Sequence, residues 1–167
     1  MRGLPRRAPL SRKQFVPAPS TYDYAVIRVV PRVEREEFVN VGVVVSCAAQ
    51  RFLEATIEVD PARIACLDPA LDLEVLQRHL DSIVRICRGG PEAGPIGALA
   101  PQERFRWLAA PRSTIIQLSP AHTGYAQDPR ALMDWLMTRM VRRPQPPGEK
   151  TAGPMDGGPA ESRANRS

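Results

Sequence analysis

Apolar and polar positions alternate along three stretches in the first part of the chain, which predicts three β-strands. The stretches cover residues 22–30, 38–46 and 51–59, and Pro31 ends the first. In the second stretch, alternation places four valines on one face: Val39, Val41, Val43 and Val45. Gly42 inside this stretch indicates a bulge or a close approach by another group. The short connections predict an antiparallel meander.

Helices are predicted where aspartate precedes proline, because aspartate caps a helix and proline is tolerated at its first position. The pairs are Asp60-Pro61, Asp68-Pro69 and Asp128-Pro129. The first pair opens a short turn. The other two open helices whose apolar residues recur every three or four positions, to about Arg88 and Val141.

The segment R-F-R-W-L-A-A-P-R-S-T-I-I-Q-L-S-P-A-H-T-G, residues 104–124, concentrates polar and aromatic side chains. Pro111 and Pro120 divide it, so we expect a short helix over 102–109, a strand over 112–119 and a loop over 120–127. The resulting order, β-β-β-α-α-β-α, predicts an α+β fold. We expect a mainly antiparallel sheet of about four strands with helices packed on one face.

Composition divides the chain into one domain, 21–143, and two tails that we expect to be disordered, 1–20 and 144–167. The first tail carries five basic residues and no acid, and it accounts for the net charge of +5. The second tail is rich in proline and glycine. Because the domain is balanced in charge, nucleic-acid contact is expected only through the basic tail, and a solvated arm is the favoured interpretation of that tail.

The cysteines Cys47, Cys66 and Cys87 are odd in number and lack a C-x-x-C pair, which favours reduced thiols in the cytoplasm. The two histidines, His79 and His122, do not complete a metal-binding pattern, so no metal site is expected. No cofactor signature is found, because the loop after about Arg88 is too poor in basic residues to hold phosphate. No stretch resembles a signal peptide or a membrane span.

Anion binding is one hypothesis for the polar residues. Arg112 could bind a phosphate or carboxylate, or it could pair with an acid of the domain. Asn40 and Arg28 lie on neighbouring predicted strands. With nearby aromatic residues they could form a basic platform for a nucleotide base or a single strand, or they could receive a packed helix.

Catalysis and protein contact are the other hypotheses. His122 could act as a base with Ser113 as a nucleophile, although no acid is placed to orient the histidine, and a hydrogen-bonded turn histidine is the alternative. Trp107, flanked by Arg104 and Arg106, has a composition that recurs at protein interfaces, but Trp107 could equally anchor a core.

The motifs F-V-N-V-G-V-V-V (38–45) and R-F-R-W-L-A-A-P-R-S-T-I-I-Q-L-S-P-A-H-T-G resemble the bacterial family called domain of unknown function 3037. The likeness covers about residues 22–141. The family has no established activity, so the resemblance implies no catalytic residue. It implies a partner, because members are thought to occur beside genes for kinase-like proteins of the HipA type.

Two functions therefore stay open. The first is a small cytoplasmic accessory or interaction module without chemistry of its own, with a kinase-like protein as its partner. The alternative is an enzyme that acts on a phosphorylated or acidic substrate through an Arg/Ser/His/Asn pocket. The first is favoured because the sequence shows no nucleophile, base and orienting acid in a recognisable set.

Overall fold

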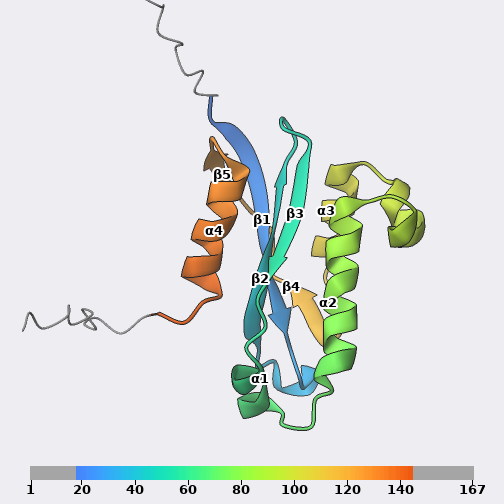
Figure 1. Cartoon of the computed structure of the whole chain (residues 1–167), viewed down its shortest axis with the longest axis vertical. Helices are drawn as coiled ribbons and strands as arrows, with labels where there is room; N and C mark the ends of the chain where they lie inside the picture. Colours follow the sequence, from blue (N-terminus) through green and yellow to red (C-terminus); the bar gives the residue numbers. More distant parts are fainter. Residues whose placement is uncertain (1–17, 145–167) are drawn as a thin grey trace, which may run out of the picture.

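A computed structural model describes residues 18–144, and the two predicted tails lie largely outside these described residues. Antiparallel strands form one sheet in the order β3-β2-β1-β4, with β5 also paired to β1 (Figure 1). The predicted α+β fold with an antiparallel sheet is confirmed. The elements are β1 (Ser20–Val29), η1 (Val33–Arg35), β2 (Val39–Cys47), β3 (Phe52–Ile57), α1 (Pro61–Leu67), α2 (Leu73–Arg88), η2 (Pro91–Ala98), α3 (Pro101–Ala109), β4 (Ile116–Leu118), β5 (His122–Ala126) and α4 (Pro129–Met140).

A β-bulge in β2 changes which face its valines occupy. Ile27 pairs with Gly42 but Arg28 pairs with Asn40, so Val41 is the extra residue. The alternation reverses there. Val41 therefore packs in the core under α2 and α3, whereas Val43 packs against α4. The prediction that four valines share one face is wrong, because a bulge shifts the side-chain period by one residue.

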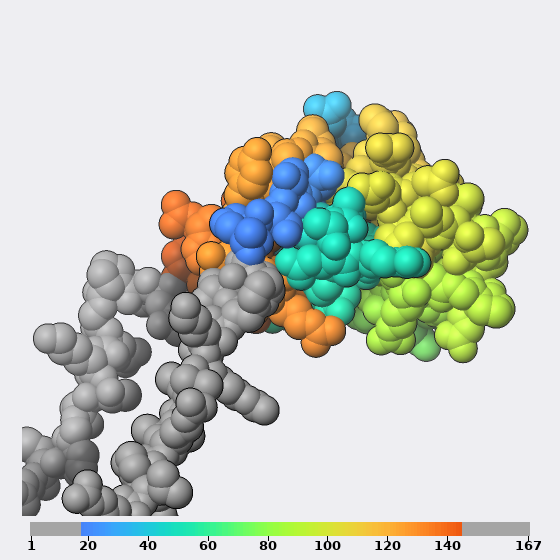
Figure 2. All heavy atoms as spheres, turned by 90° about the horizontal axis from the view of Figure 1, so that it is seen from above, coloured from blue at the N-terminus to red at the C-terminus, as the bar shows by residue number. Residues whose placement is uncertain are grey.

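Helices cover both faces of the sheet, not one face as predicted. The helices α2 and α3 enclose the larger core, and α4 packs on the opposite face against Val43 and Val45 (Figure 1). Figure 2 shows the same layering from above, with the region of α4 and β5 in orange on one side and residues 90–110 in yellow and green on the other. The bulge explains the second layer, because it sends apolar side chains to a face that must then be covered.

The edge of the sheet beside β1 is shared by β4 and β5. β4 pairs with the end of β1 at Ile27 to Val29, and β5 pairs with its beginning at Ser20 to Tyr24. The predicted strand over 112–119 is therefore shorter than expected, and the predicted loop over 120–127 contains β5. Pairing with β1 overrides the weak strand propensity around Gly124, where the ring of Tyr22 occupies the space of a missing side chain.

Aspartate side chains cap α1, α2 and α4, but one of the predicted caps, Asp68, does not begin a helix. Asp60, Asp72 and Asp128 accept backbone hydrogen bonds at the first turns of α1, α2 and α4. Asp68 caps only a turn through the Ala70 N–H, so α2 begins at Leu73 and not at Pro69. No helix in the described part of the chain is both long and apolar enough to cross a membrane.

Thiol reactivity tests the placement of the three cysteines. Cys66 is exposed, Cys47 and Cys87 are buried, and burial raises the pKa of the Cys87 thiol to about 12. Because the thiolate is the reactive form, we expect one thiol per folded chain to react with a chromogenic disulfide reagent near pH 8. All three should react in guanidinium. Rapid reaction of two or three thiols in the folded chain would contradict the burial of Cys47 and Cys87.

Candidate binding groove

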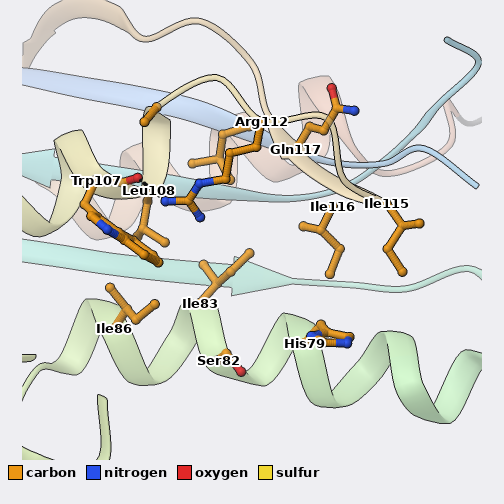
Figure 3. A pocket seen from close by; sticks show the side chains of 12 residues that line it. His79, Ser82, Ile83, Ile86, Trp107, Leu108, Arg112, Ile115, Ile116 and Gln117 are labelled. Atoms are coloured by element: carbon orange, nitrogen blue, oxygen red, sulfur yellow. Dashed lines mark hydrogen bonds between the residues drawn. The ribbon is translucent and has the colours of Figure 1, made fainter. Parts of the chain in front are cut away.

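A pocket of about 230 Å³ lies between α2, α3 and the segment that leads into β4, and we call it the β4 groove (Figure 3). Its floor is apolar, formed by Ile83, Ile86, Leu108, Ile115, Ile116 and Leu118. Its rim carries the exposed side chains of His79 from α2 and of Trp107 and Arg112 from the other side, together with the half-buried Ser82 of α2. The groove thus combines an apolar interior with a few polar groups, as binding sites commonly do.

The sequence builds the groove by ending α3 close to α2. Proline at position 111 breaks the helix after Ala109, and the chain then turns back toward the sheet and enters β4 at Ile116. Phe105 and Leu108 hold α3 in the core. On α2, Ile83 and Ile86 face the groove, and both are buried at the edge of the same core.

Arg112 is fixed against Trp107 at the rim. Its guanidinium carbon lies 3.9 Å from the centre of the Trp107 ring, and its Nη2 donates a 2.7 Å hydrogen bond to the Trp107 carbonyl oxygen. A cation over an exposed indole contributes about 0.5–1 kcal/mol. Figure 3 shows this pair at one end of the groove and His79 at the other. Trp107 is 37% exposed, so the pair remains accessible.

The rim of the groove is basic. Arg112 and His79 line it, and Arg85 reaches its edge by donating a 2.8 Å hydrogen bond to Ser82 Oγ. The lining residues include no aspartate or glutamate. An anionic group in the groove would therefore meet hydrogen-bond donors and, among the described residues that line it, no like charge.

The residues predicted to bind an anion are not brought together. Arg112 lies at the β4 groove, but Arg28 and Asn40 pair across β1 and β2 with their side chains on the α4 face. Arg28 stacks on Phe38, with its guanidinium carbon 4.3 Å from the ring centre. Asn40 donates a 2.9 Å hydrogen bond to the Met140 carbonyl at the end of α4, so its contact is with a packed helix.

The two catalytic candidates are also far apart. His122 is exposed on β5, opposite Tyr24, and its ring stacks on the tyrosine at 5.2 Å between centres. Ser113 is exposed two residues before Ile115, whose carbonyl accepts from the Val30 N–H. The six residue-to-residue steps from Tyr24 to Val30 span about 20 Å of strand. A direct hydrogen bond between His122 and Ser113 is therefore not formed.

The three residues predicted to form an interface lie in different environments. Trp107 and Arg106 are exposed. Arg104 is only 7% exposed, and its Nη1 donates to the carbonyl oxygens of Ile86 (2.9 Å) and Cys87 (3.0 Å) at the end of α2. Arg104 therefore ties α3 to α2 inside the molecule and does not belong to a surface in this structure.

Sequence reasoning missed the contribution of α2 to the groove. His79, Ser82 and Ile86 were not expected to belong to a site. One signal was present, because apolar residues at 83, 84, 86 and 87 cover more of the helix surface than a single narrow stripe. A wide apolar face at a helix end indicates that two different elements pack against it.

The geometry thus defines an α+β domain with an open, basic-rimmed groove and with its polar candidate residues on separate surfaces. Residues 24–141 match the family model described as "Protein of unknown function (DUF3037)", and the chain belongs to this family. No curated protein and no solved structure gives a significant match.

Proposed function

We propose that this protein is a non-catalytic accessory module that binds a partner protein through the β4 groove. The observation that carries the proposal is the apolar floor beside the exposed, prearranged Trp107–Arg112 pair. Tryptophan and arginine are the residues most enriched among energetic hot spots of protein interfaces. Because Arg112 is already held by the Trp107 carbonyl, a partner would immobilise little additional side-chain freedom there.

The enzyme alternative has less support. It needs Arg112, Ser113, His122 and Asn40 around one substrate, yet Asn40 contacts α4 and His122 stacks on Tyr24. The residues that do meet in the β4 groove provide binding surface and positive charge. For this reason the proposal assigns the groove to recognition and not to group transfer.

A kinase-like protein of the HipA type, as the family resemblance implies, is the first partner to test. We place the interaction in the bacterial cytoplasm. Support for this compartment comes from Cys47, Cys66 and Cys87, which are free thiols. Contact with nucleic acid through the basic tail remains a prediction that falls outside the described residues.

Site-specific photo-crosslinking in the source cell tests the proposal. A photoreactive amino acid at His79, in the groove, should trap one discrete protein. The matched control is Asp81, which is exposed on the same helix, outside the groove lining, and whose carboxylate accepts from Gln77. The proposal predicts a crosslinked species at His79 and none at Asp81. Equal yields at both positions, or no species at His79, would contradict it.

A further inference from the structure

β4 is an edge strand, and the hydrogen bonds that flank it show which of its backbone groups face β1. The Val30 N–H donates to the Ile115 carbonyl, and the Ser119 N–H donates to the Val26 carbonyl, each at 2.8 Å. In an antiparallel pair such bonded positions alternate. The backbone groups of Ile115, Gln117 and Ser119 therefore face β1.

The backbone groups of the intervening residues, Ile116 and Leu118, point away from β1 and form the outer edge of the sheet. The Ile116 carbonyl accepts from Thr114 Oγ1 at 2.6 Å. By the same alternation, the Ile116 N–H and both backbone groups of Leu118 have no partner on β1, and within the described residues no side chain donates to or accepts from them. An edge with unpaired N–H and C=O groups is a ready template for another strand.

The β4 groove lies directly beside this edge. Ile115, Ile116, Gln117 and Leu118 all line it, so the groove follows the strand for its full length. Figure 3 shows Ile115 and Ile116 directed toward α2, while the Gln117 side chain points away. A strand added next to β4 would place every second side chain over the same apolar floor.

Size and charge narrow the class of ligand. The volume of about 230 Å³ is below the roughly 300–1,000 Å³ of typical small-molecule sites, and it suits one or two side chains of a peptide. The basic rim, with Arg112 and His79 and no acid in the lining, complements a carboxylate. The N-terminal tail of the chain itself has five basic residues and no acid in 1–20, so it has no side-chain carboxylate to offer the basic rim.

We infer that the partner presents an extended acidic and apolar segment, which adds to the sheet as a strand on the outer edge of β4. Its apolar side chains enter the β4 groove and its carboxylate meets Arg112. This inference rests on the proposed function and specifies how the groove recognises its partner. Backbone pairing would supply affinity, and the groove would select the side chains.

Selection from a random 12-residue peptide library displayed on phage, with the full-length chain as bait, tests the ligand class. We expect the enriched peptides to alternate apolar and polar residues and to carry an acidic residue. N-methylation of such a peptide should weaken binding at least about tenfold at every second position and leave the others nearly unchanged. Apolar residues spaced three and four apart, or a library that yields no binder, would overturn strand addition.

Amide hydrogen exchange locates the contact. On binding the selected peptide, the N–H groups of Ile116 and Leu118 should exchange at least about tenfold more slowly, while Gln117, already paired with β1, should change little. Protection of both amides in the protein alone, rising with its concentration, would instead show that a second copy occupies the edge. Photo-crosslinking at His79 is independent of these results. A crosslinked protein at His79, together with selected peptides whose apolar residues are spaced three and four apart, would support the proposed function and contradict only strand addition.

Discussion

Replacing Gly42 by alanine should lower the free energy of unfolding by about 3 kcal/mol, at the upper end of the usual cost of overpacking. A β-carbon at this position would collide with the backbone carbonyl oxygen of Thr56 on β3, and it would lie 3.1 Å from side-chain carbons of Ile27 and Ile57. The backbone oxygen cannot move without disturbing β2–β3 pairing. Urea denaturation followed by circular dichroism measures the change.

Gly124→Ala provides the matched control, because Gly124 also lies in a strand and is also crowded. Its added β-carbon would lie 2.6 Å from the hydroxyl of Tyr22 and 2.8 Å from the adjacent ring carbon. These atoms are at the far end of a side chain that can change rotamer, so the cost should stay within about 1 kcal/mol. If the two substitutions cost the same, close backbone packing at Gly42 is not the reason for glycine there.

Arg104→Met should destabilise the protein by about 3 kcal/mol, because two carbonyl oxygens at the end of α2 lose a charged donor in a buried site. The positive charge also lies at the negative end of the helix dipole. The fold is adapted to this side chain. Gly89 has a positive φ of 76°, and a β-carbon there would collide with the Arg104 guanidinium.

Arg106→Met is the control for Arg104, since both arginines lie on α3 and were predicted to share an interface. Arg106 is exposed, and its replacement should change the free energy of unfolding by no more than about 0.5 kcal/mol. Denaturation midpoints of the two variants give the comparison. Similar losses for both would mean that the contacts of Arg104 with Ile86 and Cys87 contribute little.

Local patterns predicted the fold class and the existence of most elements. The apolar faces predicted for β1 and β3 both pack in the larger core, and two of the three predicted aspartate caps, Asp60 and Asp128, begin helices. The bulge at Val41 could be suspected from Gly42 but not placed, because it depends on the register between β1 and β2. The same shift created a second apolar face, so α4 on the opposite side could not be predicted without it.

The candidate site was harder to predict because it is assembled from distant segments. The sequence places Trp107 and Arg112 only five residues apart, and the structure joins them by stacking. Their neighbours His79 and Ile86 come from α2, and only the packing of α2 against α3 brings them near. The residues that looked catalytic lie close in sequence, but strands separate them: Ser113 precedes β4 and His122 lies on β5.

The most direct test of the binding groove uses two similar pairs on opposite faces of the sheet. Arg112 stacks on Trp107 at the groove, and Arg139 lies over Trp135, which is 54% exposed on α4. The measurement is the affinity of the crosslinked partner for two double variants, Trp107→Ala with Arg112→Ala and Trp135→Ala with Arg139→Ala. We predict at least a tenfold loss for the first variant, measured at a temperature at which both variants remain folded, and no loss for the second. An unchanged affinity for the first variant, or an equal loss for both, would contradict this prediction.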